Sequence, residues 1–90
     1  MNRKKAIELV KKDGSNLGIL PKEFKKDHEI VLIAVRNYGD ALEFVEDSLK
    51  KDKQIVFAAV QDDGRALEFA DTNLRKDKEI VLAAVQSKGD

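Results

Sequence analysis

A period of 25 residues runs through this 90-residue chain and limits its fold more than any other feature of the sequence. Shifting the chain by 25 positions aligns three aspartates and four glycines: Asp27, Asp52 and Asp77, then Gly14, Gly39, Gly64 and Gly89. Segments 27–51 and 52–76 share 12 of 25 residues, namely Asp, Ile, Val, Ala, Val, Gly, Ala, Leu, Glu, Phe, Leu and Lys. Such a period is typical of stacked repeats. We interpret residues 1–90 as one domain with a divergent first copy (2–26), two full copies and a partial fourth copy (77–90).

Each copy is expected to begin with an α-helix of about eleven residues. The aspartate that opens a copy is a favoured N-cap, because its carboxylate accepts hydrogen bonds from the free N–H groups of the first turn. After Asp27, the apolar residues Ile30, Val31, Ala34 and Val35 keep helical spacing. The period glycines suit the left-handed conformation that often ends a helix. The apolar pattern does not alternate as it would in a strand, so helix is favoured.

A second and shorter helix is expected after each glycine. The sequences DALEFV and RALEFA are good helix formers for two turns. A polar stretch then follows in each copy, interrupted by one inward leucine, Leu49 or Leu74. The predicted core also includes one leucine of the second helix and three phenylalanines: Leu67, Phe44, Phe57 and Phe69.

The first helix of an internal copy is apolar around most of its circumference. On a helical wheel, residues 30–35 leave only a narrow polar sector, which holds Glu29 and Arg36. Such a helix must be buried on two sides, as it is when each repeat packs on the copy before it and the copy after it. The sequence therefore predicts an all-α fold, a small right-handed helical-repeat solenoid of about three and a half 25-residue helix-turn-helix repeats.

The two ends of this array carry different residues at matching positions. Lys5 and Glu8 stand where Ile30 and Ile33 stand in the second copy, so the face that would meet a preceding copy is charged and caps the fold. The last helix instead stays apolar, and it offers a candidate self-association face: Val81, Leu82 and Val85. Three interpretations of this face stay open: it packs on a second molecule as a homodimer, the chain is an excerpt of a longer array, or the face is exposed and tolerated.

The phrase D-x-E-I-V-L-A-A-V-x-x-x-G-x-A-L-E-F-A-x-x-x-L-R-x-D, read from Asp27 and Asp52 onward, resembles a helical repeat known as domain of unknown function 4116. The resemblance covers residues 21–90 well. It covers the first copy poorly, because Lys5, Glu8 and the pair Leu20-Pro21 depart from the pattern. It implies an all-helical tandem repeat and a bacterial or microbial-eukaryote origin. It implies no activity, so function has to be argued from the residues themselves.

Composition excludes several classes of protein. The chain is 42% hydrophobic and 38% charged, which is too apolar for a disordered segment. Seventeen basic and seventeen acidic side chains balance, so the global attraction of a dedicated nucleic-acid or membrane-surface binder is missing. There is no cysteine, and the apolar run near the start is broken by Glu8, so we expect mature, cytoplasmic protein. No stretch reaches the roughly 20 apolar residues of a membrane span.

Paired basic residues before each predicted helix give the sharpest local signal. They are Lys25-Lys26, Lys50-Lys51 and Arg75-Lys76. Stacking would align Lys26, Lys51 and Lys76 beside three positive helix ends, which makes a candidate anion-binding ridge. The aspartates that cap the same helices oppose this field. A solvated surface is the competing interpretation.

Nothing in the sequence predicts catalysis, a cofactor or a metal. His28 is the only histidine, and lysines replace it in later copies, so we interpret it as a surface residue. Glu43 and Glu68 recur one copy apart without any sign of a cleft, and the glycines lack the companions of a phosphate loop. Tyr38 stands where Asp63 and Lys88 stand, which makes it a candidate exposed contact.

The function favoured by the sequence is a non-enzymatic protein-interaction or scaffold module, since stacked repeats offer an extended surface and no buried polar site. The alternative is an anion-binding module that engages nucleic acid or a phosphorylated partner through the ridge. Salt dependence of binding separates the two. The balanced charge argues against nucleic acid, and no membrane partner is expected.

Overall fold

The computed structural model describes residues 1–87, and each of the first three copies folds there into the same three helical segments. A long α-helix comes first, a six-residue 3₁₀-helix follows, and a short helical segment closes the copy. The long helices are α1 (Arg3–Lys12), α3 (His28–Asn37), α4 (Lys53–Asp62) and α6 (Lys78–Gln86). The 3₁₀-helices are η1 (Gly14–Ile19), η2 (Gly39–Phe44) and η4 (Gly64–Phe69). The closing segments are α2 (Lys22–Lys25), η3 (Asp47–Lys51) and α5 (Thr72–Arg75).

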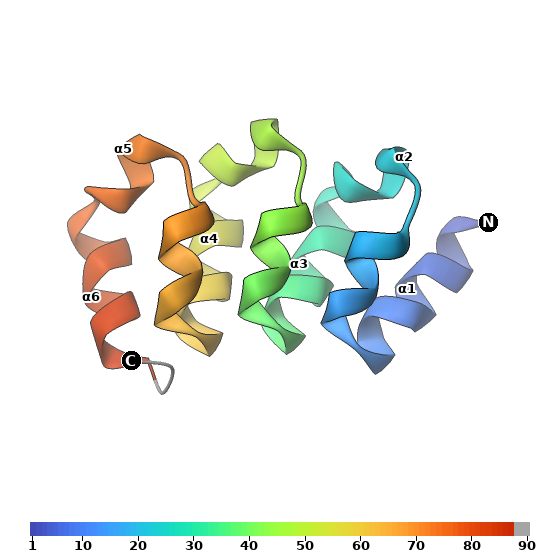
Figure 1. The fold of residues 1–90 in the computed structure, drawn as a ribbon, viewed down its shortest axis with the longest axis horizontal. Coiled ribbons are helices and arrows are strands. Elements are labelled where there is room, and N and C mark those ends of the chain that lie inside the picture. The colour runs from blue at the N-terminus through green and yellow to red at the C-terminus, as the bar shows by residue number, and fades with distance from the viewer. Residues whose placement is uncertain (88–90) are drawn as a thin grey trace.

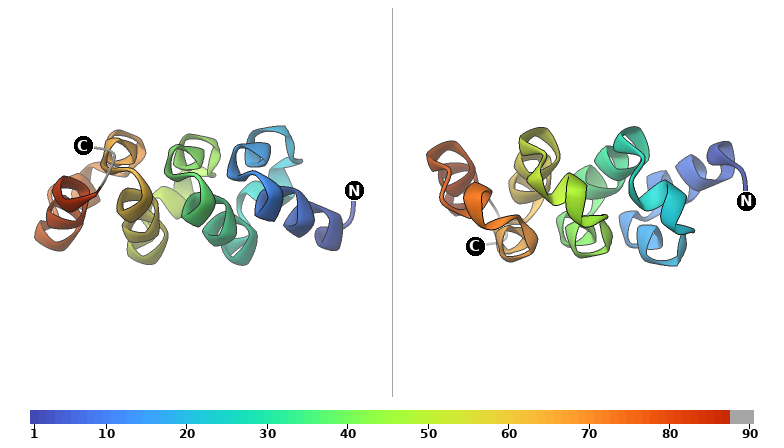
Figure 2. Two further views of the ribbon diagram at one scale, coloured as in Figure 1. Left: turned by 90° about the horizontal axis from the view of Figure 1, so that it is seen from below. Right: turned by 90° about the horizontal axis from the view of Figure 1, so that it is seen from above.

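These segments form two layers along the longest axis of a molecule that measures 38 × 24 × 15 Å. The long helices lie side by side in chain order in one layer, and the 3₁₀-helices lie in the other (Figures 1 and 2). Helices α1 and α6 lie at opposite ends of the long axis. The fold of residues 1–87 is all-α, without a strand, as the sequence predicts. None of these helices is long and apolar enough to cross a membrane.

The predicted N-caps are confirmed. The carboxylate of Asp27 accepts from the backbone N–H groups of Glu29 and Ile30, at 3.1 and 3.2 Å. Asp52 accepts from the N–H of Ile55, and Asp77 makes the equivalent pair of bonds at the start of α6. Each long helix that follows a period aspartate therefore begins one residue after it.

The apolar residues of α3 and α4 are buried on two sides, which the wheel of the sequence predicts. Four residues of each helix are completely inaccessible to solvent: Ile30, Val31, Ala34 and Val35 in α3, and Ile55, Val56, Ala59 and Val60 in α4. Each of these helices packs against a long helix on either side and against the 3₁₀ layer. Leu67 is only partly buried, whereas Leu17 and Leu42 at the same position are fully buried, so its predicted place in the core is too deep.

The glycines do not have the predicted role. No glycine among residues 1–87 has a positive φ angle, and the long helices end instead at extended residues such as Tyr38 and Asp63. A Cβ atom added to Gly39 would lie 2.4 Å from the carbonyl oxygen of Ala59. Gly14 and Gly64 face the next long helix in the same way, at 2.3 and 2.1 Å. Glycine is required because two backbones approach closely, not to end a helix. Gly89 lies outside the described residues.

The second helix is also not the single short helix that the sequence predicts. In the third copy a 3₁₀-helix ends at Phe69, Ala70 is extended, and α5 starts separately at Thr72. Asp71 causes this break, because its side chain accepts from the N–H of Asn73 while its own N–H donates to the carbonyl of Lys50. Both bonds draw the backbone out of the helix.

Candidate interaction surfaces

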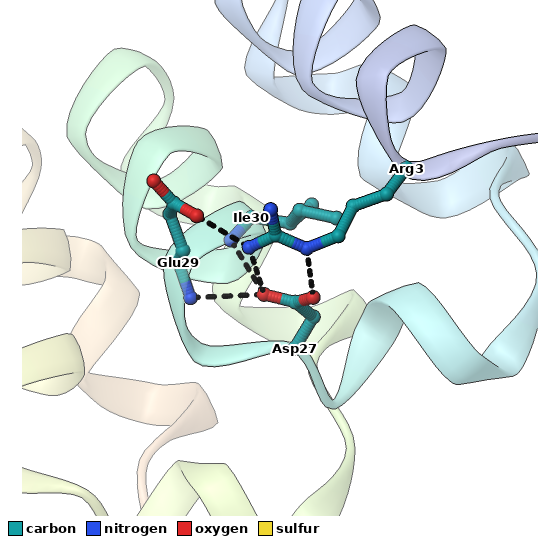
Figure 3. Close-up of polar contacts among 4 residues, drawn as sticks. All are labelled: Arg3, Asp27, Glu29 and Ile30. Atoms are coloured by element: carbon teal, nitrogen blue, oxygen red, sulfur yellow. Dashed lines mark hydrogen bonds and ion pairs between the residues drawn. The ribbon is translucent and has the colours of Figure 1, made fainter.

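A ladder of basic residues joins each copy to the N-cap of the next copy. Arg3 Nε lies 2.8 Å from Asp27 Oδ2, and its guanidinium also contacts Glu29 (Figure 3). One copy later, His28 Nε2 lies 3.2 Å from Asp52 Oδ2. One copy later again, Lys53 Nζ lies 3.3 Å from Asp77 Oδ2 and 2.6 Å from Glu79 Oε1. We call these three basic residues and three aspartates the cap ladder.

Contacts in the cap ladder shift the pKa values of Asp27, Asp77 and Lys53. The hydrogen bond from Arg3 lowers the pKa of Asp27, helped by the N–H groups of the first turn and opposed by partial burial. The N–H of Ile80 lowers the pKa of Asp77, and Lys53 adds to the effect. Glu79 and then Asp77 raise the pKa of Lys53. Asp27 and Asp77 are thus favoured as carboxylates, and each accepts hydrogen bonds from its own helix and contacts a basic residue of the preceding copy.

Sequence analysis missed this ladder. His28 is partly exposed, as expected, but it contacts the cap of the next copy. The signal was present in the sequence, because basic residues recur at positions 3, 28, 53 and 78 with the period of the aspartates. The sequence analysis considered His28 within its own copy only and interpreted it as a surface residue. Reading the cation and the next aspartate as one pair would have found the contact.

A second set of polar contacts joins the other ends of the long helices. The side-chain amide of Asn37 donates to the carbonyl of Val10 at 2.9 Å. In the next copy Asp62 accepts from the N–H of Gly39 at 2.8 Å. Ser87 then accepts from the N–H of Gly64 at 2.6 Å. The last residue or the following residue of each long helix therefore reaches back to the preceding copy.

The N-terminal end of the molecule is polar. Lys5 and Glu8 are exposed on α1. The N–H groups of Glu46 and Asp71 donate to the carbonyls of Lys25 and Lys50 in the preceding copies, at 3.0 and 3.1 Å. Pro21 stands at the same position of the first copy and has no N–H to donate. The first copy therefore presents few groups that a preceding copy would satisfy.

The C-terminal end is apolar, and we call Val81, Leu82 and Val85 the end face. These side chains are 36%, 55% and 59% exposed, whereas the valines at the matching positions of α3 and α4 are completely buried. Lys78 lies beside the end face. It stands at the position that Arg3, His28 and Lys53 occupy in the first three copies, and it has no ion pair within residues 1–87. Helix α6 thus keeps the features of an internal helix with one side uncovered.

Two hollows lie between consecutive long helices. One, of about 420 Å³, is lined by residues of α4 and α6, among them Phe57, Gln61 and Leu82. The other, of about 470 Å³, lies between α3 and α4 and shares Phe57 and Gln61 with the first. Leu82 belongs to both the first hollow and the end face. The lateral surface and the end of the molecule are therefore continuous.

The candidate ridge of Lys26, Lys51 and Lys76 is exposed, but acidic groups interrupt it. Lys26 lines a hollow of about 450 Å³ with three more lysines and three carboxylates: Lys22, Lys25 and Lys50, and Glu43, Glu46 and Asp47. Lys51 lines a neighbouring hollow with Asp47 and Asp71, and Lys76 lines neither. The first-turn N–H groups that an anion would use already bind the cap aspartates.

The remaining candidates carry no recognisable chemistry. Tyr38 is 41% exposed, and its Cβ lies where a side chain on Gly14 would be, so it covers the turn of the preceding copy. Glu43 and Glu68 are exposed. Residues 1–87 contain no fully buried polar side chain and no group of three or more metal-ligating side chains.

Comparison with known proteins gives one match. The family described as Domain of unknown function (DUF4116) matches residues 2–50 and 52–90. The match includes the first copy, which the sequence pattern had placed poorly. No protein of curated function and no solved structure matches the chain significantly.

Proposed function

Since the chain belongs to the family of Domain of unknown function (DUF4116), whose match spans all four copies, we propose that it is a small right-handed helical solenoid that acts as a non-enzymatic protein-interaction module. Its repeats span residues 2–26, 27–51, 52–76 and 77–90. The 25-residue recurrence of the cap ladder and of the glycine contacts supports stacked repeats. The family adds no activity, so the partner surface has to come from the geometry.

One observation carries the proposal. The end face exposes three large apolar side chains, and the internal helices are completely buried at two of these positions, those of Val81 and Val85, and partly buried at the third. Exposed apolar side chains that lie together mark interaction sites more often than scattered ones do. The end face continues into the hollow beside Phe57 through Leu82, which extends the surface available to a partner. The partner is a protein that offers an apolar helix.

The proposal is tested with wild-type chain, Leu82→Glu and Ile19→Glu. Ile19 is 71% exposed at the end of η1, far from the end face, so Ile19→Glu is a matched control for a new surface carboxylate. Each protein is used to select binders from a displayed library of helical peptides. We expect the selected peptides to bind wild type and Ile19→Glu, and not to bind Leu82→Glu. Peptides that bind Leu82→Glu as well as wild type would show that the interaction site lies outside the end face.

Solution mass against concentration is measured on the same three proteins. A monomer at all concentrations leaves the end face free for a different protein. A dimer that only Leu82→Glu abolishes would assign the face to a second copy of the chain. Interaction would then remain the function, but the external partner would be wrong.

Anion binding is the second candidate, and one hollow favours it. Four lysines surround the hollow beside Phe44, although three carboxylates share it. Binding of a phosphopeptide or an RNA oligonucleotide through the ridge would fall steeply with salt and would be lost in Lys51→Glu. Salt-insensitive binding that depends on Leu82 would exclude this candidate.

A further inference from the structure

We infer that the end face recognises a helix that begins with an aspartate N-cap and lies parallel to α6, with the cap carboxylate against Lys78. This inference rests on the proposed function and specifies the chemistry of the partner. It concerns only residues that form the uncovered side of α6: Val81, Leu82, Val85 and Lys78.

The polar part of the inference comes from the cap ladder. Three times within residues 1–87, a basic residue in the first turn of one long helix lies close to the N-cap aspartate of the next long helix, at 2.8, 3.2 and 3.3 Å. Lys78 occupies the fourth such position, and no carboxylate among residues 1–87 pairs with it. A partner helix with an N-cap aspartate would supply the missing group at the same place.

The apolar part comes from the internal interfaces. Val31 and Val35 of α3, and Val56 and Val60 of α4, are inaccessible in helices that pack against the following long helix, α4 or α6. Val81 and Val85 have the same chemistry and the same place on their helix. A helix that covers them must therefore be apolar on the facing side, as α4 and α6 are toward their preceding neighbours.

The direction of the partner helix follows from the two sets of contacts between copies. The ladder joins the N-terminal ends of neighbouring long helices, and Asn37 joins the C-terminal end of α3 to that of α1. Neighbouring long helices are thus parallel. A partner that uses Lys78 and the valines together has to run in the same direction as α6.

A second copy of the chain does not meet these requirements with its own first helix. The N-cap of α1 is Asn2, which carries no charge. Lys5 and Glu8 would place two charges against the end face, and burying an unpaired charge is costly. Head-to-tail stacking of identical chains is therefore excluded as the mode of recognition. The partner carries an aspartate and an apolar residue where α1 carries Asn2 and Lys5.

A full-length probe chain tests the inference. It carries Asn2→Asp, Lys5→Ile and Glu8→Ile, which give α1 the outward face of an internal helix, and Leu82→Glu, which prevents the probe from stacking on itself. The acceptor is the wild-type chain. We expect a one-to-one complex by sedimentation or calorimetry, and no complex with a Leu82→Glu acceptor. A probe with alanine at positions 5 and 8 repeats the measurement if the isoleucine probe aggregates.

Charge exchange isolates the contact with Lys78. A probe that retains Asn2 should bind about threefold more weakly, as expected for the loss of a solvent-exposed ion pair. A probe with Asn2→Lys should bind on the order of tenfold more weakly than the aspartate probe, and a Lys78→Glu acceptor should restore it. These differences should shrink in high salt.

The outcomes separate the inference from the proposed function. Binding that requires Leu82 but does not respond to charge at positions 2 and 78 would overturn the inference and keep the interaction module. Folded probes that form no complex with the wild-type acceptor would also overturn the inference. In that case the proposed function is tested only by whether the peptides selected on wild type lose binding to Leu82→Glu. A dimer formed by wild type alone and abolished by Leu82→Glu would replace the capped helix with a second copy.

Discussion

The two ends of the molecule are built from matching positions of the same sequence period, and they have opposite character. At the N-terminal end Lys5 and Glu8 are exposed, and Pro21 removes a backbone donor that the later copies use. At the C-terminal end Val81 and Val85 are exposed, although their counterparts are buried throughout the interior. The first helix is polar on its outer side, and the last helix is apolar on its outer side.

This difference shows that burial depends on the place of a helix in the molecule and not on the residue alone. Val60 and Val85 are the same residue at the same position of a long helix, and one is inaccessible while the other is 59% exposed. Substitutions that exchange residues between an end and the interior therefore test the packing directly. Four tests of the packing and of the contacts between copies follow in order of expected effect.

The largest effect is expected when the charge of the N-terminal end is moved into the interior. Ile55→Lys places a lysine at a completely buried position of α4 that corresponds to Lys5. An unpaired charge in an apolar contact should cost about 4 kcal/mol or more. Since native domains are stable by roughly 5 to 15 kcal/mol, a loss of this size should lower the urea midpoint of unfolding sharply. Circular dichroism in urea measures the loss.

The reverse exchange is the control for this first test. Lys5→Ile adds an apolar residue to an exposed position and should change the free energy of unfolding by less than about 0.5 kcal/mol. A folded Ile55→Lys variant with wild-type stability would show that α3 and α4 do not pack as described.

The second test adds a single methyl group between two copies. Gly39→Ala places a Cβ 2.4 Å from the carbonyl oxygen of Ala59, and backbone atoms cannot give way as a flexible side chain can. We expect a loss of about 3 kcal/mol from this overpacking. Gly18→Ala is the matched control, because its nearest neighbours are side-chain atoms of Phe44 at 3.1 Å. Equal effects at the two glycines would refute the close approach.

The glycines show what sequence reasoning could and could not reach. Their period is visible, and it correctly marks the end of each long helix. Their role was predicted from the local habit of glycine at helix ends, whereas the actual cause is a contact with the helix of the next copy. That helix is about 20 residues away in the chain, from Gly39 to Ala59, so no local rule reveals it.

The aspartates and His28 also show the difference between local contacts, which the sequence predicts, and contacts between copies, which it does not. The N-caps involve bonds within one turn, and the sequence predicted all three. The cap ladder joins residues 24 apart, such as His28 and Asp52, and it was missed. The apolar face of α6 was predicted because it requires only a comparison of matching positions. Local chemistry and periodicity are readable, but contacts between copies require their relative placement.

The third test compares the interior with the C-terminal end through one residue type. Val60→Ala should cost about 2 kcal/mol, because it removes buried methyl groups and leaves a cavity. Val85→Ala should cost less than about 0.5 kcal/mol, since that side chain is largely exposed. Urea denaturation of the two variants at low protein concentration gives both values. A large cost at Val85 would mean that the end face is already covered in solution.

The smallest expected effect on the free energy of unfolding concerns Asp27, which contacts Arg3 in the cap ladder, and this effect depends on pH. Arg3 and the first-turn N–H groups lower the pKa of Asp27 from its usual 3.8. Because the folded pKa lies below the unfolded one, the contribution to stability is complete above about pH 4 and is lost as the pH falls through the folded value. Asp27→Ala should therefore cost about 1 kcal/mol at neutral pH, and less below pH 3. Unfolding in urea at pH 7 and at pH 2.5 to 3 measures the difference.

The variant Arg3→Met identifies the source of this dependence. It removes the largest cause of the lowered pKa of Asp27 but leaves the cap bonds to Glu29 and Ile30 in place. Stability should then vary less between pH 7 and pH 3 than in wild type, and high salt should have the same effect as the substitution. An unchanged pH dependence in Arg3→Met would show that the cap alone lowers the pKa of Asp27. The contact of Arg3 with Asp27 would then join the first copy to the second without changing the protonation of Asp27.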